Sequence, residues 1–76
     1  MKTTANAVSL AQRPDLARIA SWIEPSTHVL DLGCADGKLL AYLQRTKNVH
    51  GSGIERDPEA VVASVRRGVS VIQQDL

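Results

Sequence analysis

Hydrophobic and polar residues alternate along this chain in blocks that predict one helix followed by a repeat of strands and helices. Over residues 14–23, apolar side chains recur at the 3.6-residue spacing of a helix with one buried face. They are Leu16, Ile19, Ala20 and Ile23. Pro14 suits the first helical position, Asp15 is favoured at the positive end of the helix dipole, and Pro25 is expected to close the helix. Residues 1–12 are small, polar and aperiodic, so we expect a flexible arm there.

Three short segments predict strands. Residues 28–32 contain apolar side chains on both sides of Asp31, which is typical of a central parallel strand covered on both faces. Residues 49–55 form a weaker candidate, because two glycines lower its strand propensity, but they lie where a crossover helix must return the chain to the next parallel strand. Residues 69–72 are rich in β-branched side chains and predict a third strand.

Two further helices are expected between these strands. In the first, from residue 38 to about 46, three leucines share one face: Leu39, Leu40 and Leu43. In the second, Asp57 can cap the start, Pro58 suits the first position, and Gly68 is the expected C-terminal cap. The expected inward face of this second helix consists of Val61, Val62 and Val65. Its expected solvated end carries Arg66 and Arg67.

Together these elements predict an α/β protein, with an N-terminal helix plus β-α-β-α-β. This is half of a doubly wound fold with a parallel sheet. Such a half leaves a sheet edge and an apolar face exposed, and both invite pairing with another chain. We therefore expect residues 13–76 to be the N-terminal portion of a larger domain, and self-association through the exposed sheet edge is a corollary.

Composition narrows the classes of function. The chain has 76 residues, enough for one small domain, and its single cysteine excludes an internal disulfide. The two histidines show no metal-ligating spacing with that cysteine. Nine basic and eight acidic residues with only two aromatics offer no basic stacking surface for nucleic acid. No apolar run resembles a signal peptide or a membrane span, so we expect a soluble, cytoplasmic protein.

The candidate chemistry lies in residues 31–37, where an acid and a glycine-rich turn join a predicted strand to a predicted helix. Such turns bring backbone N–H groups close to a nucleotide-type ligand. The dinucleotide fingerprint G-x-G-x-x-G fails, because Ala35 and Lys38 stand where its second and third glycines would be. Glu55, at the end of the next predicted strand, follows Gly33 by 22 residues. That interval is typical of the acid that binds ribose hydroxyls in doubly wound folds.

The pattern Asp31-x-Gly33-x-Ala35-x-Gly37, followed by Glu55, resembles motif I and the ribose-binding acid of class I S-adenosylmethionine-dependent methyltransferases. A closer similarity, to the MetW family of methionine-biosynthesis proteins, covers most of residues 13–76. It is carried by segments 13–16, 29–37, 40–43, 53–55 and 68–76. The resemblance implies a Rossmann-like methyltransferase fold, a role in methionine biosynthesis, and partnership with a homoserine O-acyltransferase. Members of that family are more than twice as long, so the resemblance also implies truncation.

By position, the resemblance implies S-adenosylmethionine as the cofactor and assigns its binding residues. Those expected to wrap the methionine and ribose part are Gly33, Cys34, Ala35 and Gly37. Asp31 is expected below the turn, and Glu55 is expected to bind the ribose hydroxyls. Arg56 is expected against the adenine and Asp75 at its amino group. No catalytic residue and no metal ligand is implied.

Ala35 departs from the family pattern, which has a glycine at this position. If the position requires positive φ, the methyl group costs about 1 kcal/mol or more. Three functions therefore stay open: a SAM-binding protein of the MetW type, a small-molecule or protein methyltransferase whose acceptor site lies in a missing C-terminal part, and a non-enzymatic interaction module that has lost the cofactor. An acceptor pocket needs later strands and loops, so we expect this chain alone to be inactive.

Overall fold

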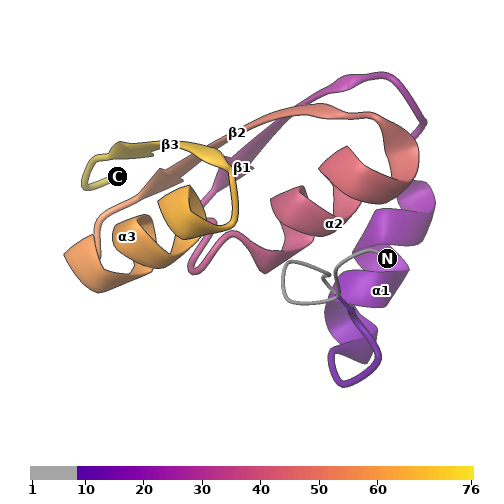
Figure 1. Cartoon of the computed structure of the whole chain (residues 1–76), viewed down its shortest axis with the longest axis horizontal. Helices are drawn as coiled ribbons and strands as arrows, with labels where there is room; N and C mark the ends of the chain where they lie inside the picture. Colours follow the sequence, from indigo (N-terminus) through magenta and orange to yellow (C-terminus); the bar gives the residue numbers. More distant parts are fainter. Residues whose placement is uncertain (1–8) are drawn as a thin grey trace.

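A computed structural model describes residues 9–76 as three helices and three strands in the predicted order (Figure 1). The helices are α1 (Pro14–Trp22), α2 (Lys38–Lys47) and α3 (Pro58–Arg66), and the strands are β1 (His28–Leu32), β2 (His50–Glu55) and β3 (Ser70–Gln73). All strands are parallel, in the spatial order β1-β2-β3. The predicted α/β architecture, half of a doubly wound sheet, is confirmed.

The local signals that predicted the helix starts act as expected. Pro14 and Pro58 occupy first-turn positions, where the N–H that proline lacks has no partner within the helix. The Asp57 side chain caps α3 by accepting a hydrogen bond from the Glu59 N–H at 3.2 Å. None of the helices in the described part of the chain is long and apolar enough to cross a membrane.

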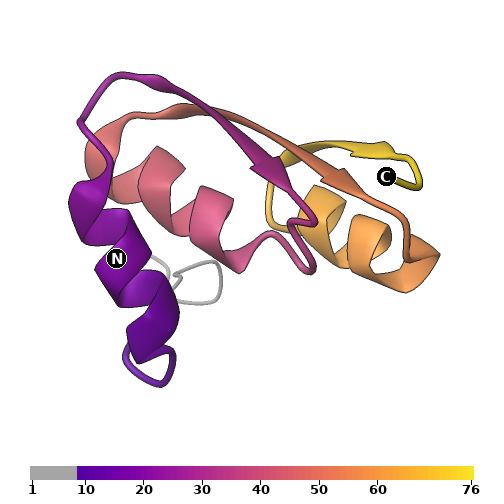
Figure 2. The ribbon, with the colours of Figure 1, turned by 180° about the vertical axis from the view of Figure 1, so that it is seen from behind.

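Helices α2 and α3 lie on the same face of the sheet, as the two opposite views show (Figures 1 and 2). This follows from the strand order, because successive right-handed crossovers that advance in one direction place their helices on one side. We call this the covered face. The opposite side, which no element in residues 9–76 covers, is the bare face.

Two glycines of β2 let α2 and the loop that precedes it approach the covered face closely. A Cβ atom on Gly51 would lie 2.8 Å from Leu40 Cδ2, and one on Gly53 would lie 2.8 Å from Cys34 Cβ. Leu40 is fully buried as a result. The glycines that weaken the strand's intrinsic propensity are therefore required by its packing.

The buried side chains form two clusters. One, consisting of Cys34, Leu40, Ala41 and Val69, lies between α2 and the sheet. The other, consisting of Leu10, Ala20, Leu43 and Val49, joins α1 to α2. Of the arm expected at residues 1–12, residues 1–8 lie outside the described part of the chain, while Leu10 packs into the second cluster with 6% of its surface exposed.

Helix α1 is attached by a cation as well as by apolar contacts. The Lys47 ammonium donates hydrogen bonds to the carbonyl oxygens of Ala20, at 2.7 Å, and Ile23, at 2.8 Å. Both carbonyls belong to the C-terminal end of α1, where a positive charge is favoured by the helix dipole.

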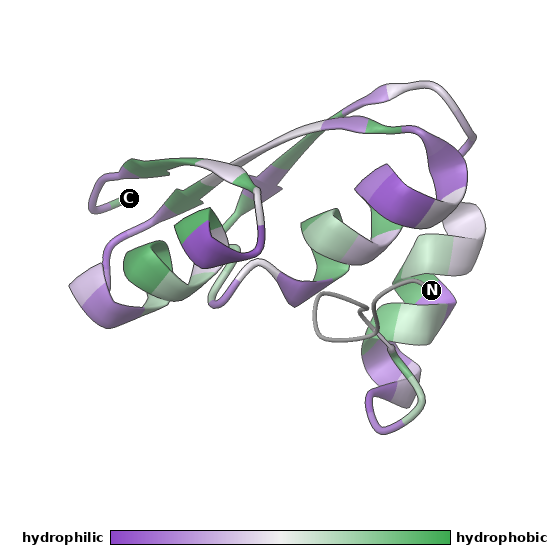
Figure 3. Ribbon diagram, viewed as in Figure 1, coloured by the Kyte–Doolittle hydropathy of each residue, from purple (hydrophilic) through white to green (hydrophobic). Residues whose placement is uncertain are grey.

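The expectation that β1 is covered on both faces is not met. Leu30 and Leu32 point to the bare face and remain 61% and 59% exposed. Leu32, Ile54 and Ile72 occupy the same register position across the three strands and form an apolar row. Figure 3 shows hydrophobic segments, in green, in the strands as well as in the helices. At the opposite end of this face, the rings of His28 and His50 stack with their centroids 5.2 Å apart.

Candidate functional site

The candidate site lies where the three parallel strands end. The loop 33–37 follows β1, Glu55 ends β2, and residues 74–76 follow β3. In open parallel sheets, ligands bind outside the carboxyl ends of the strands. Chain topology therefore brings the predicted acid and the predicted turn to the same edge.

The loop adopts a conformation that demands small residues. Gly33, Ala35 and Gly37 have φ angles of +75°, +53° and +77°, which favour glycine. The N–H groups of Gly33 and Cys34 both donate to the carbonyl oxygen of Ile54, at 2.8 and 3.1 Å, and this anchors the loop to β2. Ala35 does occupy the left-handed region, so its methyl group carries the cost of about 1 kcal/mol expected there.

The carboxylate of Glu55 faces this loop directly. Its Oε1 accepts a hydrogen bond from the Ala35 N–H at 2.8 Å, and its Oε2 accepts one from the Asp57 N–H at 3.0 Å. The Asp57 amide, followed by the Ala35 amide, lowers the pKa of Glu55, so the side chain is ionised at neutral pH. A carboxylate has about four acceptor positions, so these two bonds leave capacity for further donors.

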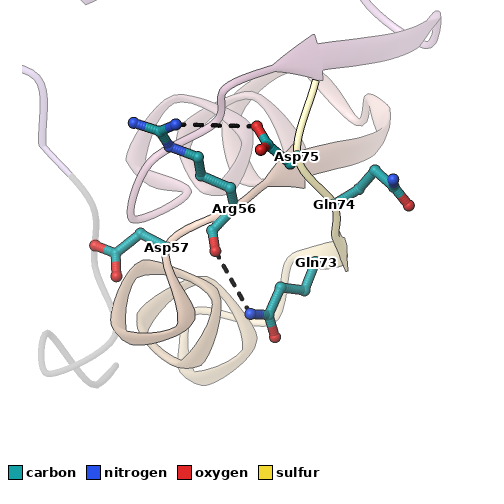
Figure 4. A pocket seen from close by; sticks show the side chains of 5 residues that line it. All are labelled: Arg56, Asp57, Gln73, Gln74 and Asp75. Atoms are coloured by element: carbon teal, nitrogen blue, oxygen red, sulfur yellow. Dashed lines mark hydrogen bonds and ion pairs between the residues drawn. The ribbon is translucent and has the colours of Figure 1, made fainter.

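A cavity of about 240 Å³ lies between the loop and the ends of β2 and β3. Its lining includes four of the residues assigned by resemblance: Gly33, Glu55, Arg56 and Asp75. It adjoins an open hollow lined by Arg56, Asp57, Gln73, Gln74 and Asp75 (Figure 4). Arg56 Nη1 and Asp75 Oδ1 lie 3.9 Å apart across this hollow, and both side chains are largely exposed, so their attraction is screened by water.

A second cavity, of about 180 Å³, lies on the other side of the loop, between β1 and α1. It is lined by Asp31, Gly33, Cys34 and Ala35 of the predicted set, and by residues of both charge signs. Those charged residues are Arg13, Asp31, Asp36 and Lys38. Partial burial raises the pKa of Asp31. Arg13 is paired with Asp15 at 2.8 Å, and this pairing holds the pKa of Asp15 at about 2.

Two of the eight assigned residues, Cys34 and Gly37, pack the loop against its neighbours, although Cys34 is also among the residues that line the smaller cavity. The Cys34 side chain is buried against β2 and α3, and burial raises its thiol pKa, so the reactive thiolate is disfavoured. Gly37 lines neither cavity, and a Cβ there would meet Ser64 Oγ at 2.8 Å. Cys34 and Gly37 allow the loop to pack closely against β2 and α3, and neither needs to contact a ligand for this role.

Sequence reasoning missed the contribution of α3. The inward side of this helix is marked by Ser64, which is fully buried. Val62 and Val65 are 48% and 59% exposed, so the predicted valine face is wrong at these two positions, whereas Val61 is half-buried. Arg67, predicted as part of a solvated end, instead reaches Asp36 in the loop. Nothing in the sequence indicated that Ser64, on a valine-rich helix, would donate a hydrogen bond to the loop 33–37.

The parallel sheet, the glycine loop and the facing carboxylate place the chain in the class of methyltransferase-like α/β folds. It is similar to a SAM-dependent methyltransferase of Geobacter sulfurreducens in complex with S-adenosyl-L-homocysteine, at 25% identity, with a TM-score of 0.63 and coverage of 99% of this chain and 32% of that one. An enzyme of the same description from Thiobacillus denitrificans, also solved with S-adenosyl-L-homocysteine, shares the fold at 23% identity, with a TM-score of 0.74 and coverage of 93% and 33%. The E. coli protein YjhP has 25% identity, a TM-score of 0.72 and coverage of 83% and 30%.

The chain belongs to the family described as Methionine biosynthesis protein MetW, whose model matches residues 13–76. No curated protein sequence matches it. The chain spans about a third of the length of the solved structures that it resembles.

Proposed function

We propose that this chain binds S-adenosylmethionine at the carboxyl edge of its sheet, as the cofactor-binding part of a methyltransferase-like protein of methionine biosynthesis. The observation that carries the proposal is the 240 Å³ cavity in which Gly33 and the ionised Glu55 face Arg56 and Asp75. Two relatives with this fold were solved with S-adenosyl-L-homocysteine, which supports the choice of ligand.

In this proposal the adenosine occupies the 240 Å³ cavity between the loop and the ends of β2 and β3. Glu55 accepts hydrogen bonds from the ribose hydroxyls with the acceptor positions that Ala35 and Asp57 leave open. Arg56 lies against the adenine ring, where its planar guanidinium can stack. Asp75 accepts a hydrogen bond from the adenine amino group.

The methionine end of the cofactor occupies the smaller cavity between β1 and α1. Gly33 lines both cavities, so one ligand can pass across the loop. Asp31 offers a partner for the ligand ammonium, and Lys38 and Arg13 offer partners for its carboxylate. Asp31 must be ionised for this role, and a neighbouring ammonium group would lower its burial-raised pKa.

Calorimetric titration of the full chain with S-adenosyl-L-homocysteine tests the proposal. We expect Glu55→Gln to weaken binding at least about tenfold, since about 1.4 kcal/mol is typical for losing a charged acceptor. Glutamine keeps an oxygen for the Ala35 N–H, so the loop contact is conserved. Glu59→Gln, which makes the same charge change at an exposed position, should bind as the wild type does. Absence of binding by the wild type would overturn the proposal, and equal affinity of both Glu55 forms would remove Glu55 from the site.

We further propose that the MetW-type protein acts with a homoserine O-acyltransferase, an assignment that rests on the family. Co-purification of that acyltransferase with the tagged chain is the expected outcome. Its absence, together with methyl transfer to a small molecule or protein, would favour an independent methyltransferase.

One structural feature favours a third candidate, an interaction module without cofactor. Ala35 holds a strained φ of +53°, and its amide is already satisfied by Glu55. A wild-type chain that captures a protein partner but leaves S-adenosyl-L-homocysteine unbound would select this candidate.

A further inference from the structure

The loop 33–37 contains one position that needs external support, because Ala35 holds a positive φ angle that is free of strain only in glycine. On the β2 side, Ile54 and Glu55 hold its amide groups. Its carbonyl groups are held from the opposite direction, by two side chains of the segment that contains α3. These contacts join residues about 30 positions apart in sequence.

Ser64 supplies the first support. It is fully buried, and its hydroxyl donates a hydrogen bond to the carbonyl oxygen of Ala35 at 2.9 Å. The same side chain contacts the backbone of Gly37 so closely that a Cβ on that glycine would lie 2.8 Å from Ser64 Oγ. One serine therefore touches the loop on both sides of Asp36.

Arg67 supplies the second support. Its Nε donates to the carbonyl oxygen of Asp36 at 3.1 Å, and its Nη2 pairs with the Asp36 carboxylate at 3.2 Å. The Arg67 and Asp36 side chains are only 32% and 45% exposed. This two-point contact uses the planar guanidinium fork, which a lysine side chain cannot reproduce.

Two successive peptide planes of the loop are thus fixed from α3. Ser64 holds the carbonyl that joins Ala35 to Asp36, and Arg67 holds the carbonyl that joins Asp36 to Gly37. In a trans peptide the N–H points opposite to its carbonyl, so fixing these oxygens also fixes the directions of the Asp36 and Gly37 amides.

We propose that Ser64 and Arg67 are positioning residues that hold the loop 33–37 in its cofactor-binding conformation without touching the cofactor. The inference deepens the proposed function and rests on it. Removing either support lets the loop relax away from the positive φ at Ala35, while the sheet and the Glu55 side chain stay in place.

The first experiment titrates S-adenosyl-L-homocysteine into Ser64→Ala and Arg67→Met forms of the full chain. We expect at least a fivefold loss of affinity in each. The matched controls are Ser70→Ala, at an exposed serine, and Arg66→Met, at the exposed arginine beside Arg67; both should bind as the wild type does. Arg67→Lys should recover only part of the lost affinity, because lysine keeps the positive charge but lacks the two guanidinium donors that bind Asp36.

A second readout separates positioning from general stability. If Ser64 offsets strain at Ala35, the change Ala35→Gly removes that strain, so the double variant Ala35→Gly, Ser64→Ala should regain affinity relative to Ser64→Ala. Two effects that simply add would show that Ser64 acts only on the stability of α3, and the proposal would fail for this residue.

Backbone NMR of the ligand-free chain keeps this test independent of cofactor binding. We expect the amide signals of residues 35–37 to move in Ser64→Ala and Arg67→Met, and to stay in place in Ser70→Ala and Arg66→Met. Unmoved signals in the first pair would overturn the inference even if the wild type binds cofactor. If the signals move in Ser64→Ala and Arg67→Met but the wild type binds no S-adenosyl-L-homocysteine, the positioning role is supported and the proposed ligand is refuted.

Discussion

The two faces of the sheet differ in what their side chains meet. On the covered face, β2 presents glycines, and the space that they leave is filled by Leu40. On the bare face, Leu32, Ile54 and Ile72 form a row with no described element packed on it. The apolar character of a strand residue is therefore a poor guide to its burial here, and the position of the crossover helices decides it.

The covered face should be the more sensitive to truncation. We expect Leu40→Ala to lower the free energy of unfolding by about 2–5 kcal/mol, the range for deleting a buried leucine side chain. Leu32→Ala, the same change at a 59% exposed position, should cost less than about 1 kcal/mol. Urea denaturation followed by circular dichroism measures both, and similar losses would refute the distinction between the faces.

The covered face should also reject added volume. A Cβ at Gly53 would clash with the Sγ of Cys34 and lie 2.8 Å from its Cβ, so we expect Gly53→Ala to cost about 1–3 kcal/mol. Ser52→Ala, one residue earlier and pointing to the bare face, is the control and should change stability by less than about 0.5 kcal/mol. The same denaturation assay decides the outcome, and a neutral Gly53→Ala would mean that the loop carrying Cys34 can move outward freely.

On the bare face we expect substitutions to act on association more than on stability. We expect the row formed by Leu32, Ile54 and Ile72 to favour contact between copies of the chain through this face, in addition to the sheet edge from which self-association was expected. Ile72→Lys should therefore lower the concentration-dependent mass seen by sedimentation, with an effect on unfolding of about 0.5 kcal/mol or less. Val62→Lys, at an exposed valine of α3, is the control. A wild type that stays monomeric at all concentrations would contradict the prediction.

The smallest expected effect is a pair of opposite pH dependences. Burial raises the pKa of Asp31 in the folded chain. The contribution of Asp31 to the free energy of unfolding is therefore complete below its unfolded-state pKa and is lost as pH rises through its folded-state pKa. Asp31→Asn should thus raise the urea midpoint at pH 7 and leave it unchanged at pH 3.

Glu55 should show the reverse sign. Backbone amides lower the pKa of Glu55 in the folded chain. Its contribution to the free energy of unfolding is therefore present above the unfolded-state pKa and is lost as pH falls through the folded-state pKa. Glu55→Gln should lower the midpoint at pH 7, and the difference should shrink under acid conditions. Parallel pH profiles for the two variants would show that one of these assignments is wrong.

Much of the fold could be predicted because its signals are local. Pro14, Asp57 and Pro58 mark helix starts through their own backbone chemistry, and the periodic leucines mark the buried side of α2. The approach of Glu55 to the loop could also be predicted, because parallel strands end at a common edge. These inferences need no knowledge of which helix packs where.

The rest depends on tertiary contacts that leave no pattern in the sequence. Ser64 is buried because the loop requires a donor at that point, and this contact overrides the apolar preference that favoured Val62 and Val65. Arg67 likewise resembles any cation at a helix end until Asp36 is placed beside it. Leu30 and Leu32 resemble core residues, but residues 9–76 include no layer above them.

The ammonium of Lys47 has a consequence for how the chain holds together. Helix α1 lies outside the alternating strands and helices, and its last turn is tied to α2 by this side chain in addition to the apolar cluster that contains Ala20 and Leu43. Acetylation of that amine would remove its charge and loosen the first segment of the chain, while the sheet keeps its register. The α1 residues that line the smaller cavity, Leu16 and Ile19, are therefore held in place partly by a contact at the C-terminal end of that helix.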